Sequence, residues 1–408
     1  MPVSSDPDEI HVGIVTALPV ECAAVRLLVD DLVDQPAPGD PNHYMSGWLP
    51  SRELGRPHRV VVAMQAQDGT RNAATISTDL IRSFPHVRCV VMCGIAGGMP
   101  TPAVPERHVR LGDIVVGTGG VVDYDHTRTV NGTDQLRRSV GGQSPVLLRA
   151  DRELQAREHI GDWPWRMWLE GWHRRMPPGF TRPPERTDLL LWRGQRIEHP
   201  RREESGHAPG WPKVHRGAIA SSDRLVRDAV KRDELAERYR VYAVEMETSG
   251  IAVGADLHAA HWFVVRGIVD YCDHASKNDV WHRYSALAAA AYLRALLAEC
   301  RPFTDRGMRL GNGDSLAGLT RVVDALLAVP QMRDDYQRRA IMALLPEHIR
   351  TTVPDNVNGR LHVVALVQTC FGAADGRESL LGALRLSLPA QSLDLRRAAE
   401  AIEAHWPG

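Results

Sequence analysis

The amino-acid sequence predicts an α/β core with a mixed, largely parallel sheet, followed by a small all-α bundle. Over the first three quarters of the chain, continuous apolar runs such as Arg59–Met64 and Arg88–Cys93 alternate with stretches of helical periodicity. Such runs are typical of parallel strands that helices cover on both faces. After Arg301–Ser315, which is rich in glycine and charged residues, apolar residues recur at helical spacing only. This change of pattern predicts a separate helical domain.

In the core, the sequence pattern predicts six strands and at least two helices. A helix from about Val20 to Leu28 and another over Asn72–Ser83 separate the early strands, and the glycine run Gly94–Gly98 predicts a tight strand-to-helix turn. The expected strands are His11–Ala17, Arg59–Met64, Arg88–Cys93, Asp113–Gly117, Tyr239–Val244 and Trp262–Val269.

The domain prediction is a core over 1–302, a linker over 303–315 and a helical domain over 316–408. Within the core, residues 126–216 look like an insertion of loops with one helix. This segment holds six of the ten tryptophans and 17 lysine or arginine residues against 11 aspartate or glutamate residues. The helices expected in the last domain are Leu316–Val329, Asp334–Leu345, Leu361–Cys370, Glu378–Arg385 and Leu395–His405.

Composition excludes several classes of protein. A formal charge of −1 over 408 residues argues against binding nucleic acid or a membrane surface through overall charge. No apolar run approaches the length of a bilayer span, and Met1–Ile10 is polar and acidic, unlike a secretory signal. The six cysteines lack paired CxxC spacing, which indicates reduced thiols in a cytoplasmic protein.

Carboxylates that follow apolar strands are the main functional signal. Val244–Glu247 and Arg266–Asp273 place acids at the edge of apolar runs, and Glu21 follows the first strand. An ionised carboxylate is costly to desolvate, so acids at such positions are candidates for function. Because ligands bind at the carboxyl ends of parallel strands, these acids are expected to share one site.

Six short segments together carry a family resemblance. They are Gly13–Glu21, Cys93–Gly98, Gly112–Val116, Gly217–Asp223, Val244–Glu247 and Val265–Asp270. In this order they resemble the nucleoside phosphorylase superfamily, and they look most like its methylthioadenosine/S-adenosylhomocysteine nucleosidase branch. The resemblance covers about residues 10–300 and implies a three-layer core.

Two further segments resemble proteins of biological conflict. Arg266–Asn278, followed by Trp281, is similar to nucleosidase domains of bacterial and fungal immune proteins. The segment Val322–Arg333 resembles effector-associated domains, which are death-domain-like helical adaptors. The second resemblance implies a protein partner that docks on the helical domain, in an antiphage or conflict system.

The family resemblance implies three catalytic carboxylates. Asp270 matches the acid that protonates purine N7, Glu21 the base that activates the attacking water, and Glu247 the acid that binds the ribose hydroxyls. From the residues alone, Asp270 could instead cap the next helix, with Asp273 as that cap or a support. Glu21 could simply interact favourably with a helix N-terminus.

The resemblance also implies a set of substrate-binding residues. Met246 matches the residue beneath the sugar, and Glu245 is a substrate contact or a fold-stabilising acid. The remaining members are Ile95, Ala96 and Gly97 of the glycine run, and Asp223, Leu225 and Val226 beside the purine. The chain departs from the family pattern at Ile95, where relatives often carry a hydroxyl, and at Ser222, where they carry glycine.

The insertion offers weaker signals. Trp163, Trp165, Trp168 and Trp172 have a spacing more typical of a packed helix face than of a platform that stacks on bases. Its basic residues fit a solvated face, although arginine also matches phosphate geometry. The arginines considered for phosphate binding are Arg174, Arg175, Arg201 and Arg202.

Three functions compete on these observations. The first is a hydrolytic nucleosidase that acts on an adenine nucleoside or nucleotide such as ATP. The second is a phosphate-dependent purine nucleoside phosphorylase, for which Arg71 is the one obvious phosphate ligand. The third is a nucleotide-sensing adaptor with a vestigial site. A homo-oligomer is expected from the resemblance, and no cofactor or metal site is expected because the chain has neither a P-loop nor zinc-spaced ligands.

Overall fold

The structure, a computed structural model, divides into two compact units, Met1–Phe303 and Thr304–Gly408. Each unit has a hydrophobic core of its own. Residues 304–313 of the predicted linker lie outside the described residues, and its last two residues already belong to a helix. The described residues are 10–130, 133–136, 142–170, 177, 179–192, 195–273, 279–303, 314–353, 359–371, 373, 375–389 and 391–406.

A mixed, largely parallel sheet forms the centre of unit 1, as predicted. Its main path runs β12-β6-β15-β5-β1-β4-β3-β2, with β13, β14 and β7 joined beside it. The central neighbours β4, β1, β5 and β15 are parallel, whereas β2, β3 and the β6–β15 pair are antiparallel. The strands are β1 (Val12–Thr16), β2 (Asp30–Asp34), β3 (Tyr44–Leu49), β4 (His58–Met64), β5 (Cys89–Gly98), β6 (Ile114–Val116), β7 (Val121–Asp123), β12 (Val214–Arg216), β13 (Ile219–Ser221), β14 (Ala243–Glu245) and β15 (His261–Asp270).

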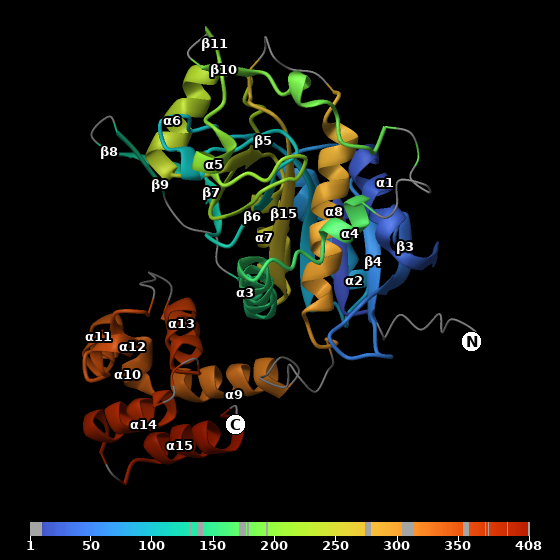
Figure 1. The fold of residues 1–408 in the computed structure, drawn as a ribbon. Coiled ribbons are helices and arrows are strands. Elements are labelled where there is room, and N and C mark those ends of the chain that lie inside the picture. The colour runs from blue at the N-terminus through green and yellow to red at the C-terminus, as the bar shows by residue number, and fades with distance from the viewer. Residues whose placement is uncertain are drawn as a thin grey trace. The chain divides into compact units, whose positions relative to one another are not determined.

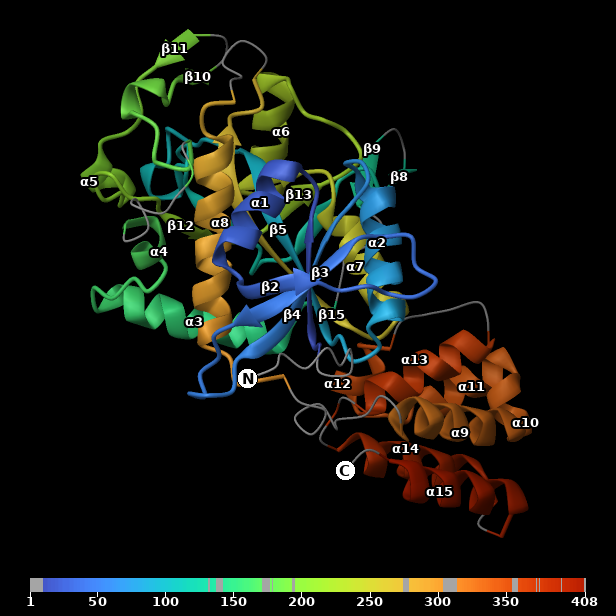
Figure 2. The same ribbon diagram turned by 90° about the vertical axis from the view of Figure 1, so that its right-hand side faces the viewer.

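Helices cover both faces of this sheet, which gives three layers (Figures 1 and 2). On one face α1 (Pro19–Leu28) packs beside α8 (His282–Ala298), and on the other α2 (Thr70–Ser83) packs against α7 (Thr248–Leu257). Helix α8 is rich in alanine and almost wholly buried. Its small side chains allow it to pack close to β5 and β15. The central strands are therefore buried on both sides, in agreement with their continuous apolar sequences.

The glycine run is part of a strand, which corrects the prediction of a turn. Strand β5 continues through Gly94–Gly98 and pairs with β15 along that length. Gly97 and Gly98 also pair with Val244 and Ala243 of β14. Residues without bulky side chains allow β14 to cross close to the end of β5, and this requirement explains the composition better than a turn does.

The insertion is more ordered than the sequence predicted. It contains α3 (Pro145–His159), α4 (Arg166–Glu170), the short helix α5 (Arg202–Ser205) and the hairpins β8–β9 (Thr127–Val130 and Thr133–Leu136) and β10–β11 (Leu190–Trp192 and Gln195–Ile197). Strand β12 belongs to the main sheet, where it pairs with β6. The last residues of the predicted 126–216 insertion are therefore core.

The described tryptophans of the predicted helix face differ in their surroundings. Trp165 is buried and Trp168 packs against the main core, whereas Trp163 is 36% exposed. The Arg166 guanidinium lies 3.8 Å from the ring centroid of Trp163. Trp163 and Trp165 precede α4, so these two rings do not share a helical face with Trp168, and Trp172 lies outside the described residues.

Unit 2 is helical, as predicted, and its apolar faces enclose a separate core. Among the described residues of both units, no helix combines the length and apolar character that crossing a bilayer requires. The helices of unit 2 are α9 (Asp314–Ala328), α10 (Pro330–Arg333), α11 (Asp335–Met342), α12 (Glu347–Arg350), α13 (Gly359–Phe371), α14 (Gly376–Ser387) and α15 (Leu393–His405).

Candidate active site

A fully buried arginine joins three of the carboxylates. Arg266 lies in β15 with no exposed side-chain area. Its Nη2 forms ion pairs with Glu245 and, at 2.9 Å, with Glu247 Oε2, and its Nη1 lies 3.7 Å from Glu21 Oε1. Burial alone would lower the pKa of Arg266, but the three carboxylates outweigh it and raise that pKa. Arg266 is therefore a permanent cation at the centre of an acidic cluster.

Glu21 is held in this cluster by backbone donors from two elements. It stands in the first turn of α1, where its Oε2 accepts hydrogen bonds from the backbone N–H groups of Ala17 (2.7 Å) and Leu18 (2.9 Å). Its Oε1 accepts a 2.7 Å hydrogen bond from the backbone N–H of Ile95. The capping interaction considered from the sequence is real, and the same carboxylate also reaches β5. Burial raises the pKa of Glu21 despite Arg266 and these donors.

Because Gly94 has no side chain, the side chains of Glu21 and Arg266 have room to meet beside it. A Cβ atom at Gly94 would lie 2.5 Å from Glu21 Cδ and 2.7 Å from Arg266 Nη1. Real Cβ atoms do not tolerate such approaches, so any side chain at this position would displace one of the two groups. Gly94 is thus a requirement of the site rather than of a turn.

Glu245 stabilises the fold as well as pairing with Arg266. It ends β14, and its Oε2 accepts hydrogen bonds from the Thr248 backbone N–H (3.0 Å) and the Thr248 hydroxyl (2.8 Å). It thereby satisfies donors at the N-terminus of α7, which would otherwise lack partners. Of the two roles considered for Glu245, these contacts favour the stabilising one.

Glu247 takes a different position, outside the strand. It is the N-cap residue of α7, and its Oε1 lies 3.4 Å from the backbone nitrogen of Gly69, directly before α2. Its other oxygen meets Arg266. Burial raises the pKa of Glu247 to about 7, and the neighbouring carboxylates of Glu245 and Glu21 act in the same direction. A buried carboxylate that titrates near neutrality is a frequent property of functional sites.

Asp270 ends β15 directly after an irregularity in the pairing of that strand with β5. Its Oδ1 accepts a 2.9 Å hydrogen bond from the backbone N–H of Cys272, a residue with φ of 56°. Bulges of this kind re-aim side chains next to active sites. Neither Asp270 nor Asp273 caps α8, the next described helix, because the N-cap residue of α8 is Trp281.

A cleft opens beside Asp270, and several predicted substrate-binding residues line it. Gly97, Leu225, Val226, Met246 and Glu245 all contribute to its wall. A Cβ atom at Gly97 would overlap Cys272 Sγ and lie 3.2 Å from Asp270 Oδ1, so this glycine keeps the wall open. The other lining residues are Arg224, Arg227, Val244, Cys272 and Asp273.

Three predicted substrate-binding residues take positions away from the lining of this cleft, and so do the predicted catalytic acids Glu21 and Glu247. Asp223 Oδ1 accepts a 2.6 Å hydrogen bond from the backbone N–H of Thr70 and so holds the start of α2. Ile95 contributes backbone only, donating to Glu21 and accepting from Arg266 Nη1 at 3.2 Å. Ala96 is buried in the sheet, where it pairs with Ile268.

Arg266 is the residue that sequence reasoning missed. It lies inside one of the segments that carry the resemblance, yet no role was assigned to it. A signal was present, because an arginine within the apolar run Trp262–Val269 has to find buried partners. The partners themselves are far away in sequence, and only the fold identifies them.

The arrangement suits cleavage of a bond next to a sugar. Acids on two sides of a substrate allow one to protonate the leaving group while another activates a nucleophile. Asp270 faces the cleft, while Glu21 and Glu247 are held by Arg266, four residues earlier on the same strand.

Comparisons with known proteins agree with this picture. Residues 11–298 match the sequence model of the phosphorylase superfamily, and residues 323–403 match that of effector-associated domain 2. A nucleotide-binding leucine-rich repeat (NLR)-like protein of the fungus Hyaloscypha variabilis is 27% identical over 84% of this chain and 34% of its own length. The ATP nucleosidase Cap17 of Escherichia coli strain KTE188 is 26% identical over 68% of this chain and 49% of its own length. The chain thus spans half or less of the length of these curated relatives.

Among solved structures, a 5′-methylthioadenosine/S-adenosylhomocysteine nucleosidase from Neisseria meningitidis is 20% identical, with a TM-score of 0.47 over 70% of this chain and 98% of the other. Futalosine hydrolase of Helicobacter pylori strain 26695 is 18% identical, with a TM-score of 0.46 over 71% of this chain and 97% of the other.

Proposed function

The chain belongs to the phosphorylase superfamily, and from that premise we propose that it is a nucleosidase that hydrolyses the N-glycosidic bond of an adenine nucleoside or nucleotide. The observation that carries the proposal is the meeting of Glu21 and Glu247 at Arg266, on the strand that ends with Asp270 in an open cleft. The curated relative from Escherichia coli, named an ATP nucleosidase, supports the reaction class.

In the proposed reaction three carboxylates have separate roles. Asp270 donates a proton to N7 of the purine, so that the electron pair of the breaking C1′–N9 bond leaves with a neutral base. Glu21 accepts a proton from the water whose oxygen forms the new bond to C1′. Glu247 accepts hydrogen bonds from the ribose hydroxyls and holds the sugar in place. The products are free adenine and a sugar with a hydroxyl at C1′.

The remaining contacts set the position of the substrate. Met246 is proposed to lie beneath the sugar, and Leu225 and Val226 to flank the base. Arg266 fixes Glu21 and Glu247 relative to one another, and it is a positioning residue because its side chain is wholly buried. The carboxylates stay close together because this cation offsets their mutual repulsion.

ATP is the substrate that we propose within this class. The name of the Escherichia coli relative supports it, and so do two exposed arginines near the site, Arg71 and Arg224, whose pairs with Asp223 (3.6 Å) and Asp125 (3.2 Å) are long. Arginine forks match phosphate oxygens. The insertion arginines fit this role less well, since Arg201 pairs with Glu204 and Arg202 with Glu185, both at short range. Arg174 and Arg175 lie outside the described residues.

Product analysis tests the proposal directly. The full chain, incubated with adenosine, ATP, methylthioadenosine and S-adenosylhomocysteine, is expected to release adenine from at least one, and Asp270→Asn is expected to remove that activity. If free base appears only when inorganic phosphate is added, with sugar 1-phosphate as the other product, the chain is a phosphorylase. Nucleotide binding without turnover, unchanged by Asp270→Asn, identifies a sensing adaptor instead.

We further propose that unit 2 docks on a protein partner in a conflict system, and that the nucleosidase acts as its effector. The match of residues 323–403 to an effector-associated domain supports this. Affinity capture with unit 2 as bait is expected to recover a partner bearing a similar helical domain, whose addition raises adenine release. Full activity without partner, together with an empty capture, contradicts the proposal.

A further inference from the structure

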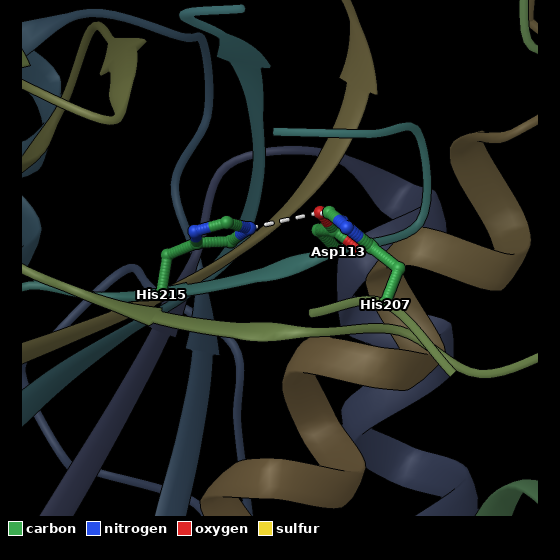
Figure 3. Close-up of side chains that lie close together, drawn as sticks. All are labelled: Asp113, His207 and His215. Atoms are coloured by element: carbon green, nitrogen blue, oxygen red, sulfur yellow. Dashed lines mark hydrogen bonds and ion pairs between the residues drawn. The ribbon is translucent and has the colours of Figure 1, made fainter. Parts of the chain in front are cut away.

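A second buried cluster, separate from the cleft, joins the insertion to the sheet. Asp113 stands directly before β6, His207 follows α5, and His215 lies in β12 (Figure 3). Their side chains are 1–2% exposed. Among the described residues they are the one group of three or more histidine, cysteine or acidic residues whose ligand atoms lie within 4.8 Å of one another. None of the three lines the cleft beside Asp270.

Three polar neighbours crowd one oxygen of Asp113. Asp113 Oδ2 lies 2.8 Å from His207 Nε2 and 2.9 Å from His215 Nε2, and it also accepts a 2.8 Å hydrogen bond from the backbone N–H of Arg110. Oδ1, by contrast, accepts the backbone N–H of Lys213 at 2.9 Å. A carboxylate oxygen has two lone-pair positions, which the three neighbours of Oδ2 have to share.

The tautomer of His207 sharpens the conflict. Ser205 Oγ lies 3.0 Å from Arg201 O and 2.9 Å from His207 Nδ1, and its single proton can go to either. When that proton goes to the carbonyl oxygen, His207 Nδ1–H is the donor to Oγ. In the neutral ring this leaves a lone pair on Nε2, pointing at the lone pairs of Asp113 Oδ2. Two acceptors at this distance repel each other, and a cation bound by both atoms removes that repulsion.

We propose that Asp113, His207 and His215 bind one divalent transition-metal ion of the Zn²⁺ class. A single ion would occupy one lone-pair position of Oδ2 and accept both histidine Nε2 lone pairs, which resolves the crowding. Two imidazoles and a carboxylate are ligands that zinc commonly takes, with water in a fourth position. The Ser205 hydroxyl that orients His207 is the kind of outer partner that supports a metal-ligating histidine.

The role of this ion is structural. It ties the α5–β12 segment of the insertion to the start of β6, and the side chains of its ligands are only 1–2% exposed. Lys213 opposes binding, because its ammonium interacts electrostatically with Asp113 and His215. That ammonium donates at 2.7 Å to the carbonyl oxygens of Glu106 and Ser205, which disperse part of its charge.

Metal analysis of the full chain, purified without a metal-affinity tag, tests the site. We expect about one equivalent of zinc per chain by elemental mass spectrometry, and its removal by a chelator to lower the melting temperature reversibly. Replacement by cobalt is expected to give tetrahedral d–d bands without thiolate charge-transfer absorption. That spectrum matters because the six buried cysteines are the competing ligands. A chain that binds no zinc or cobalt after chelation, or that shows thiolate ligation, overturns the proposal.

Variants locate the metal. His207→Gln and His215→Gln are expected to weaken zinc binding by about tenfold or more, and zinc should no longer raise their melting temperature. The matched control is His58→Gln, which removes another buried histidine of unit 1 that bonds to Leu297 O outside the cluster. It should keep its zinc. Equal zinc affinity in all three variants places the ion elsewhere and refutes this site, and the cobalt spectrum of the unchanged chain decides the question if a variant does not fold.

Discussion

At the scale of single residues, the site depends on charge balance around Arg266. The guanidinium is wholly buried and serves Glu21, Glu245 and Glu247 together. The Coulomb gain of a buried pair hardly exceeds its desolvation cost, but removing one partner leaves the others as uncompensated buried charges. The cluster is therefore a condition for a folded site more than a source of net stability.

The first prediction removes this cation. Arg266→Met is expected to lower the free energy of unfolding by about 3–5 kcal/mol, because three carboxylates lose their counter-charge. Adenine release should be lost as well. Urea unfolding followed by circular dichroism measures the first effect. The exposed Arg26→Met is the control and should stay within about 0.5 kcal/mol of the parent. An unchanged urea midpoint for Arg266→Met contradicts the charge argument.

The second prediction concerns pH. Burial raises the pKa of Glu247 to about 7, and only the ionised carboxylate can accept hydrogen bonds from both ribose hydroxyls. We therefore expect KM to fall as pH rises through about 7, where half of the Glu247 carboxylates are ionised, and to level off only above that pH. Glu247→Gln should have a higher KM that lacks this dependence. If KM of Glu247→Gln still falls with rising pH in the same way, the titrating group is another residue.

The same shift has a consequence for stability, with the opposite trend. The folded-state pKa lies above the ordinary value of 4.5, so the folded chain holds a proton that the unfolded chain has released. The contribution of Glu247 to stability is complete below about pH 4.5 and is lost as pH rises through about 7. Proton uptake thus favours the fold while it weakens sugar binding.

Much of the candidate site was accessible from sequence at this scale, but not its connections. Glu21, Glu247 and Asp270 were identified because they follow strands in segments with a family resemblance. The pairing of Arg266 with distant acids was not, because local pattern carries no information about contacts across the sheet. For the same reason the sequence did not predict that Glu245 accepts a hydrogen bond from the start of α7 and Asp223 one from the start of α2.

At the scale of elements, five of the six predicted strands agreed with the structure, and the confirmed α/β fold followed from their order. The sixth, Tyr239–Val244, is strand only from Ala243 onward, because Tyr239 ends the helix α6 (Ala229–Tyr239). The errors have physical causes. The end of β5 was assigned to a turn because it is rich in glycine, but here small residues allow both β14 and β15 to pair with β5. Strand β12 was assigned to the insertion because its three residues are too few to show alternation.

The third prediction tests the end of β5. Gly94→Ala places a Cβ 2.5 Å from Glu21 Cδ and 2.7 Å from Arg266 Nη1. A displacement of about 1 Å in a catalytic group can cost about a hundredfold in rate, so we expect a loss of that order in kcat/KM. The control is Gly382→Ala in α14, where a Cβ meets nothing within 4 Å. That change should preserve kcat/KM and stabilise its helix by about 0.5–1 kcal/mol. Equal kcat/KM for both variants contradicts the steric argument.

At the scale of the whole molecule, the two units have separate cores. The core of unit 1 ends at Phe303, and that of unit 2 begins at Val322. The sequence shows the same division. Strand and helix patterns alternate in unit 1, whereas unit 2 shows helical periodicity alone. Substitutions at sites that share no partners act additively on stability, and the two cores share no residue, so damage to one core should leave the other intact.

The last prediction applies that separation to function. Leu366 is fully buried in the core of unit 2 on α13, and Leu366→Ala is expected to destabilise this unit by about 2–5 kcal/mol. Scanning calorimetry should show two transitions, of which only that of unit 2 moves, while adenine release without a partner stays unchanged. The control is Leu386→Ala, where the leucine is 78% exposed and little should change. If both transitions shift together, or if base release falls in parallel, the units fold and act as one, because damage confined to the helical core has then reached the carboxylates around Arg266.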